Sequence, residues 1–591
     1  MKGPSQSRGG TARHSSRPPS GLPPTETASP SRTWPPEWGV LGVILALALA
    51  LRLQGLWWGV PDWAISPTDP GAPHYFSYHP DEWSILQPAV EQMNRRGDLN
   101  PHFFHYGTLY IYGVAAGIAL ARRLGLVELT PGYTGFLYVL ARLGAVFLGV
   151  LTVWLTYLLG CRCYGRWVGR GAALLLALWP LHVVHSHFAA VDVPVTFWIA
   201  LSLLGAAHLL PAKAASGAAP SPPGWPWLLT AGGAAGLAAS TKYNGGVVLL
   251  PVLAAIFLRG RQAPASLRPS ASRGGMAVAV AGAAFLLGTP YALLDFPHFW
   301  AQVQDEIRHA HEARTLDFLG TAPGWLYYLR YGFPAGLGWM STVAAGVGLG
   351  VASLRRERGD LLLLSWVFPF YLLVGAAQDH FIRYLIPLLP ALAVLTARWL
   401  WEVGNHPGTG RRAMGAVISL GVVLSAGAKS WAYLHLFDPP EVQTEVARWF
   451  RQNVPPGTRV GLTERPWFFT PPLVPANGGS APGARQIFDR DPESKRYRWV
   501  WLGFQAEVLA REKPEWVLLT DFEYGPRLRL KQPAALAFLE QLEQDYRLHL
   551  RVHRLPSLLG WTFDRGPVPH DWRYLNPEVR VYRRREATEE R

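Results

Sequence analysis

The stretch "YGTLYIYGVAAGIALA", Tyr106–Ala121, decides how this chain is threaded through a membrane. It is mostly apolar but has only 16 residues, whereas a helix needs about 20 to cross a bilayer. If this stretch crosses, every later loop changes sides. Its placement therefore has to agree with the distribution of positive charge along the rest of the chain.

The composition indicates a membrane protein. The chain has 591 residues, of which 49% are apolar and 16% charged, and its mean hydropathy is +0.10. A soluble protein carries about a quarter charged residues. The net charge of +15 is spread over short basic clusters between apolar runs, which excludes a nucleic-acid partner and favours the lipid bilayer. We predict eleven spans, at 39–57, 136–160, 171–189, 194–211, 226–240, 246–258, 275–291, 332–353, 360–377, 384–402 and 413–432.

The positive charges place 106–121 outside the set of spans. If it does not cross and the N-terminus is cytoplasmic, the cytoplasmic pieces carry 18 Lys and Arg residues and the outer loops between spans carry 9. If it crosses, the count becomes 12 against 15. Cytoplasmic loops carry the excess of positive charge, so we predict an interfacial helix over 106–121. The expected location is the plasma (inner) membrane, with multiple spans and a cytoplasmic N-terminus.

Composition also divides the chain into three parts. Residues 1–36, rich in Ser, Pro, Gly and Arg, form a predicted disordered cytoplasmic tail. Residues 37–437 hold the spans. From 438 to 591 the pattern becomes helix, Pro-Gly turn and strand, and "KPEWVLLTDF", Lys513–Phe522, is typical of a buried strand. We predict a small α/β domain there, on the extracytoplasmic side because the number of spans is odd.

Polar residues at the ends of spans fall on the predicted outer face. The first outer loop contains "HPDEW", His79–Trp83, with the adjacent acids Asp81 and Glu82. Charged residues beside spans mark a pathway or site by default. The further members of this outer set are His187, Asp192, Lys242, Asp295 and residues 379–383.

Four fragments in this order resemble the membrane glycosyltransferases of the GT-C superfamily. They are "HPDEW", "GRWVGRGAALLLALWPLHVVHSHFAAVDVPVTFW", "STKYNGGVVLLP" and "HFIRYLIPLLPAL". The chain is similar over about 39–430 to the branch of protein O-mannosyltransferases and lipid A aminoarabinose transferases (glycosyltransferase family 39-like). The resemblance implies a polytopic helical bundle with juxtamembrane helices in the first outer loop. It also implies transfer of a sugar from a polyprenyl-phosphate carrier to a protein, lipid or glycan acceptor on the extracytoplasmic face.

The resemblance implies roles for individual residues. Asp81 is the expected base that takes the acceptor's proton, and a single displacement inverts the anomeric centre. Glu82 would orient Asp81, bind a cation or contact the acceptor. Asp192 would hold the sugar or acceptor, and Lys242 and Arg383 would grip the carrier phosphate. A divalent cation is left open. The other residues expected to touch substrate are His79, His187, Tyr243, Asn244, His380 and Tyr384.

Structural roles compete with these functional ones. Asp81, Glu82 and Asp192 can cap helices, while Lys242 and Arg383 can extend from spans to the interface. The spacing of His182, His185 and His187 permits a metal site, although separate hydrogen bonds explain it better.

A secondary transporter or lipid-carrier flippase with an outer soluble domain is the alternative function. It would place ionisable residues at mid-bilayer, in interrupted helices related by a repeat. The acids here lie at span ends with no visible repeat, which favours the enzyme.

Overall fold

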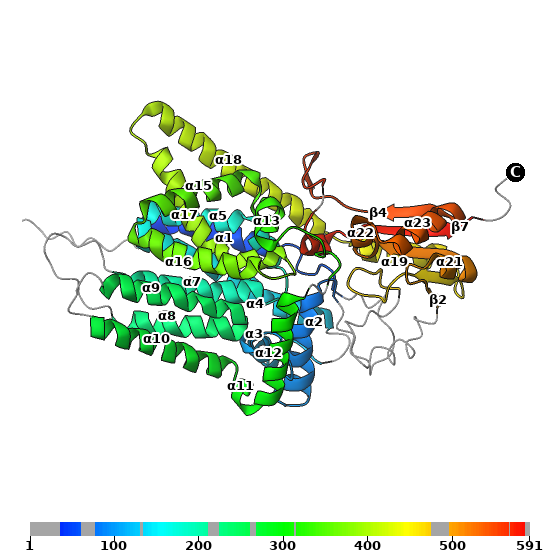
Figure 1. Ribbon diagram of the computed structural model, residues 1–591, viewed down its shortest axis with the longest axis horizontal. Helices are drawn as coiled ribbons and strands as arrows, with labels where there is room; N and C mark the ends of the chain where they lie inside the picture. Colours follow the sequence, from blue (N-terminus) through cyan, green and yellow to red (C-terminus); the bar gives the residue numbers. More distant parts are fainter. Residues whose placement is uncertain are drawn as a thin grey trace, which may run out of the picture.

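The computed structural model shows a helical bundle with a smaller α/β domain beyond one of its ends (Figure 1). The predicted tail lies outside the described residues. The residues that the structure describes are 36–60, 77–129, 134–210, 224–260, 267–312, 315–473, 496–566 and 568–585.

Helices occupy the positions of all eleven predicted spans. The helices of the bundle are α1 (Pro36–Leu53), α4 (Thr134–Tyr164), α5 (Arg166–Leu178), α6 (Pro180–His185), α7 (Asp192–Leu209), α8 (Trp225–Thr241), α9 (Leu249–Gly260), α10 (Leu267–Gly288), α14 (Phe333–Leu337), α15 (Trp339–Arg355), α16 (Arg358–Gly375), α17 (Leu389–Gly404) and α18 (Thr409–Leu434). Short 3₁₀ turns, η3 (Tyr243–Val248) and η6 (Ile382–Leu388), precede α9 and α17.

Fewer helices than predicted are long and apolar enough to cross a bilayer. The described residues hold seven, or eight if the pair 324–337 and 339–355, bent by 119°, forms one span. The predicted first span is a shorter apolar helix, Gly39–Leu53. The predicted span 171–189 is divided between α5 and α6 at Pro180, because proline lacks the N–H that would continue the helix. The span 226–240 is α8, which has 17 residues.

Most of the stretch 106–121 lies in the helix α3 (Leu109–Arg123), which is not among the candidate spans. Its apolar face packs on α2 (Pro80–Gln87) and on the π-helical turn η1 (Pro88–Arg95) in a separate cluster of buried side chains. Figure 1 shows α2 and α12 (Phe296–His311) running across the end of the bundle, on the side of the α/β domain. The segment between α1 and α4 therefore supplies helices that cover this end of the bundle.

Close packing in the bundle depends on small residues. Helix α8 lies between α7 and α10, and a Cβ added at Gly236 would lie 2.0 Å from the carbonyl oxygen of Ala281. Only glycine fits at such a crossing, as is typical of helices packed in a membrane. A Cβ added at Gly205 of α7 would likewise lie 2.9 Å from the backbone nitrogen of Ala231 in α8, so close packing also fixes α7 relative to α8.

The C-terminal domain is a mixed five-stranded sheet with helices on both faces. Strand order is β2-β1-β3-β7-β4; β1 is parallel to β2 and β3, and β7 is antiparallel to β3 and β4. The strands are β1 (Arg459–Leu462), β2 (Arg498–Trp501), β3 (Trp516–Thr520), β4 (Tyr546–Val552) and β7 (Val579–Arg584). The helices are α19 (Val442–Asn453), α21 (Ala506–Glu512), α22 (Asp521–Arg529) and α23 (Pro533–Asp545).

The interior of this sheet agrees with the sequence pattern. Every residue of β3 is buried, because β3 is the central strand. Helix α19 packs on one face of the sheet, and α21 and α23 pack on the other. A small hairpin, β5 (Ser557–Leu558) and β6 (Trp561–Thr562), and the 3₁₀ turn η9 (His570–Leu575) come between β4 and β7. The predicted fold class, a helical bundle with a C-terminal α/β domain, is confirmed.

Candidate active site

Four of the predicted side chains meet at one end of the bundle. The Nη2 atom of Arg383 lies 3.2 Å from Oδ2 of Asp81, and its Nε atom lies 3.8 Å from Oδ2 of Asp192. Lys242 donates a hydrogen bond from Nζ to Oδ1 of Asp192 at 2.7 Å. We call these four residues the charged cluster. Every pair in it joins segments that are far apart in the sequence.

The positions of helix ends explain why these residues meet. Asp192 is the first residue of α7, Lys242 follows the last residue of α8, and Arg383 lies in the turn before α17. Asp81 is the second residue of α2. Successive antiparallel helices bring such ends to the same side of a bundle. Because the ends lie at a boundary of the apolar core, the charges there need not be buried at mid-bilayer.

The cluster is only partly open to solvent. The side chain of Asp81 is 16% exposed and that of Lys242 is 14% exposed, whereas Asp192 and Arg383 are nearly covered. Lys242 Nζ also lies 4.4 Å from the centroid of the Tyr384 ring, a cation–π contact. Tyr384 therefore lines the cluster, and its role in binding substrate stays a prediction. A ligand that enters would meet Asp81 and Lys242 first.

Glu82 points away from the charged cluster. Its two carboxylate oxygens accept hydrogen bonds from Nε and Nη2 of Arg142, both at 2.7 Å. They also accept from the Ser77 hydroxyl at 2.7 Å and the Ala189 N–H at 2.9 Å. Burial alone would raise the pKa of Glu82, but the charge and hydrogen bonds of Arg142 lower it below its usual value. Glu82 is therefore a buried carboxylate that ties α2 to α4.

His79 holds the first turn of α2. The Asp81 N–H donates to its Nδ1 atom at 3.3 Å, and its ring packs against Phe188 and Tyr574. Burial lowers the pKa of His79 well below its usual value of 6.5, so the ring is neutral and Nδ1 can accept. His79 thus positions Asp81 through the backbone.

The remaining predicted residues are divided between the neighbourhood of the site and the bundle. The Tyr243 hydroxyl lies 2.7 Å from the carbonyl oxygen of Phe104, which joins η3 to the first outer loop. Asn244 follows it in η3, with Oδ1 buried and without a hydrogen-bond partner among the described residues. His380 packs among aromatic rings near η6, those of Phe318, Tyr327 and Tyr328.

His187 does not contact the charged cluster. Its ring nitrogens lie 2.9 Å and 2.8 Å from the carbonyl oxygens of Val183 and Gln54. Its ring stacks on Phe437. These contacts connect α1 and α6, which is a structural role.

No member of the predicted histidine trio belongs to a potential metal-binding group among the described residues. The Nδ1 atom of His182 pairs with Arg52 at 2.8 Å. A different group, His102, Asp295 and His298, places one potential ligand atom of each residue within 4.8 Å of the others. Exposed groups of this kind are common without an ion, so we assign no metal there.

Three residues at the site were missed from the sequence. Arg142 is a lone arginine inside the apolar run of α4, and this exception to the apolar pattern is a usable signal. Asp571 and Tyr574 contact Arg383 from η9. Nothing in the segment "HDWRYL", His570–Leu575, indicates that it packs against a membrane helix.

Comparison with known proteins agrees with this architecture. Residues 124–303 match the family described as dolichyl-phosphate-mannose-protein mannosyltransferase. An undecaprenyl phosphate-alpha-4-amino-4-deoxy-L-arabinose arabinosyl transferase of Pectobacterium carotovorum subsp. carotovorum is 25% identical over 432 residues, 69% of this chain and 68% of the relative. The protein of the same name from Pectobacterium atrosepticum is 24% identical over 375 residues, 61% of this chain and 58% of the relative.

Solved structures also align with most of the chain. ArnT from Cupriavidus metallidurans bound to undecaprenyl phosphate covers 92% of this chain and 98% of its own, with 14% identity and a TM-score of 0.47. The oligosaccharyltransferase AglB from Archaeoglobus fulgidus covers 85% of this chain and 71% of its own, with 12% identity and a TM-score of 0.48.

The family match and the curated relatives, together with the helical bundle and the terminal α/β domain, indicate a membrane glycosyltransferase that uses a polyprenyl-phosphate sugar donor. The chain is a multi-pass integral membrane protein that is similar to the protein O-mannosyltransferases over 124–303 and to the aminoarabinose transferases over 69% of its length. The predicted family and enzyme class are thereby confirmed, and the transporter alternative is set aside.

Proposed function

We propose that this enzyme moves a sugar from a polyprenyl-phosphate carrier to an acceptor hydroxyl, with inversion, on the extracytoplasmic face. The charged cluster supports this proposal most strongly. It combines two cations with a partly exposed carboxylate at one end of the bundle. Such a set suits a reaction in which a phosphate leaves and a proton is removed.

Lys242 and Arg383 are the groups that would bind the carrier phosphate. A guanidinium can form two parallel hydrogen bonds to a phosphate, and an ammonium acts as a point charge beside it. Both cations of the cluster are paired with carboxylates. An incoming phosphate would compete with Asp81 for Arg383, since both are anions that bind the same guanidinium.

This competition would prepare Asp81 for its role as base. While Oδ2 of Asp81 lies 3.2 Å from Nη2 of Arg383, that oxygen is occupied by the guanidinium. When the phosphate takes over Arg383, Asp81 becomes available to accept the proton of the acceptor hydroxyl as it attacks the anomeric carbon. The phosphate then leaves as an anion stabilised by the two cations, so no general acid is needed.

Asp192 and Glu82 have supporting roles in this proposal. Asp192 is nearly covered and bound to Lys242, so it would orient the ammonium in addition to any contact with sugar. Of the three roles predicted for Glu82, its buried pairing with Arg142 favours orientation of Asp81 through α2.

The extracytoplasmic orientation is supported by charge. The 18-to-9 distribution of basic residues places the loops that carry the cluster outside. The cluster and the C-terminal domain lie at the same end of the bundle (Figure 1). One orientation therefore applies to both.

The experiment is to incubate the purified full-length protein with a panel of polyprenyl-phosphate sugars and measure release of the free carrier phosphate. We expect release from at least one donor in the wild type, and none above background in the Asp81→Asn variant. Lack of release from every donor by folded wild-type protein would refute the proposal.

A further inference from the structure

The turn η9 of the C-terminal domain contacts the catalytic end of the bundle. Within it, the side chain of Asp571 has no exposed surface. Its Oδ1 atom accepts a hydrogen bond from the N–H of Ile382 at 3.1 Å, and its Oδ2 atom accepts from the N–H of Arg383 at 2.9 Å. They are the first two N–H groups of η6, and a helix offers no hydrogen-bond acceptor of its own to the N–H groups of its first turn. Asp571 thus caps the turn that carries Arg383.

The same segment also touches the side chain of Arg383. The Oδ2 atom of Asp571 lies 3.7 Å from Nη1, and Nη1 donates to the Tyr574 hydroxyl at 3.4 Å. The other two nitrogens, Nη2 and Nε, face Asp81 and Asp192. The guanidinium therefore has one side held by η9 and the other directed into the charged cluster.

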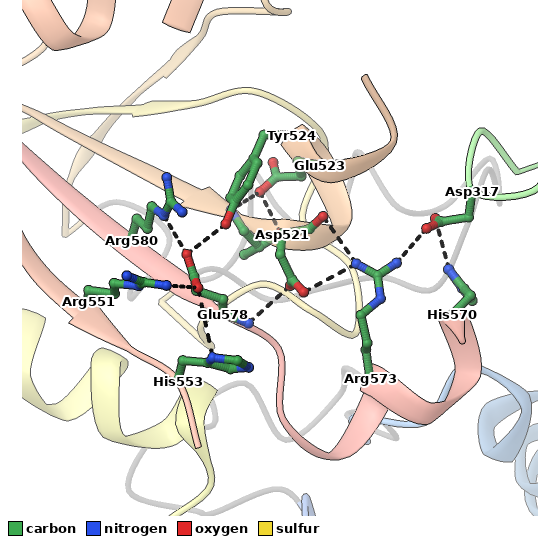
Figure 2. A network of polar contacts seen from close by, with 11 residues as sticks. Asp317, Asp521, Glu523, Tyr524, Arg551, His553, His570, Arg573, Glu578 and Arg580 are labelled. Carbon is green, nitrogen blue, oxygen red and sulfur yellow. Dashed lines mark hydrogen bonds and ion pairs between the residues drawn. The ribbon is translucent and has the colours of Figure 1, made fainter. Parts of the chain in front are cut away.

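A second network holds η9 itself in place (Figure 2). Arg573 donates to both Asp521, at the start of α22, and Asp317, in the loop after α12. The Nδ1 atom of His570 lies 2.8 Å from Oδ2 of Asp317. Figure 2 shows Arg573 between the two carboxylates. The loop after α12 and the end of the central strand β3 are thus both tied to η9.

From this arrangement we infer that Asp571 is a positioning residue for Arg383, and that the C-terminal domain completes the site for the carrier phosphate. This inference rests on the proposed function. Asp571 fixes the backbone of Arg383 and places its carboxyl group behind the guanidinium. Arg383 can then exchange Asp81 for a phosphate without losing its own position.

Asp571→Asn is the main test. The asparagine keeps the size of the side chain but removes its charge, and its amide NH₂ group would face a backbone N–H in place of an acceptor. Binding of undecaprenyl phosphate to the purified full-length protein in detergent should weaken about tenfold, the size of losing one charge-assisted contact. Binding of undecaprenol, which lacks the phosphate, should not change.

A matched control is Asp564→Asn. Asp564 also joins the C-terminal domain to a membrane helix, through Lys429 and Tyr433 of α18. Neither of these partners belongs to the charged cluster. We expect wild-type affinity for undecaprenyl phosphate in this variant. If Asp564→Asn and Asp571→Asn weaken the binding of undecaprenyl phosphate equally, the affinity depends on docking of the whole domain and not on Asp571 itself. That result would overturn the inference.

Tyr574→Phe keeps the test decisive if Asp571→Asn does not fold. The ring packs against Phe468 and Phe522, so phenylalanine preserves this packing and removes only the hydroxyl beside Arg383. We expect about threefold weaker binding of undecaprenyl phosphate, as for loss of one weak hydrogen bond. Unchanged binding in this variant, or in folded Asp571→Asn, would overturn the inference.

Kinetics separate positioning from folding. With an active donor, Asp571→Asn should raise KM for the donor while kcat stays within about twofold, because bound donor still meets the same base. A merely structural role would lower kcat through loss of active molecules and leave KM unchanged. Wild-type protein that binds no undecaprenyl phosphate would instead refute the proposed donor, and the inference with it.

Discussion

The adjacent acids Asp81 and Glu82 should respond in opposite ways to loss of charge. Glu82→Gln removes the partner of Arg142, whose side chain is 1% exposed and forms two of the four hydrogen bonds to the carboxylate. It also sets an amide NH₂ group against a donor. Removing one partner of a buried ion pair lowers the free energy of unfolding by about 3–5 kcal/mol, because the other charge is left buried without a partner. We therefore expect a marked drop in the thermal midpoint of Glu82→Gln.

The assay compares thermal unfolding in detergent with turnover per folded molecule. Glu82→Gln should lose stability but retain much of its turnover, because Glu82 does not touch the charged cluster. Adding Arg142→Met should recover part of the lost stability, since the uncompensated charge is then gone. A Glu82→Gln variant with wild-type stability and abolished turnover would refute this reasoning and exchange the roles of the two acids.

The other predictions concern chemistry, donor binding, pH and topology. Asp81→Asn should lower turnover about 10²- to 10⁴-fold without weakening donor binding, because the amide no longer competes with the phosphate for Arg383. Lys242→Met and Arg383→Lys should raise KM for the donor, measured at saturating acceptor. Burial raises the pKa of Glu523 to about 7 from 4.5, so this carboxyl reduces stability as the pH rises between these values. At pH 8 the free energy of unfolding of Glu523→Gln should therefore exceed that of wild type by up to about 3 kcal/mol. This difference, measured by thermal unfolding, should disappear as the pH falls toward 4.5. A reporter that is active only in the cytoplasm should be silent when fused after Arg591, and a strong signal would contradict the proposed topology.

Much of the architecture follows from local patterns in the sequence. The helix α23 and the strand β4 lie where "AALAFLEQLEQDYRLHLRV" changes from a helical to a strand period. Asp192, Lys242 and Arg383 could be found because each lies at the end of an apolar helix, and Asp81 could be found because it belongs to the stretch "HPDEW". Such residues reach a common surface once the helices are antiparallel, whatever the details of packing.

What the sequence could not provide were long-range pairings. His187 and Asp192 are both polar residues beside a predicted span, so the sequence does not distinguish their roles. Only Asp192 contacts the charged cluster, because the ring of His187 is directed toward the end of α1. The partner of Glu82 is 60 residues away, and the η9 contacts to Arg383 span 188 residues and more. Local periodicity carries no record of such partners. The helix break at Pro180 differs from these pairings, because the proline itself is a local signal for it.

The place of η9 in the chain has a consequence for how the enzyme is made. Residues 570–575 are translated after all the membrane helices, so a nascent chain can complete its bundle while the N–H groups of Ile382 and Arg383 still lack their cap. The last folding event of biogenesis, docking of the finished sheet, would then also be the event that switches on donor binding. A chain cut short before Asp571 would insert into the membrane yet remain idle, and it would not consume lipid-linked sugar.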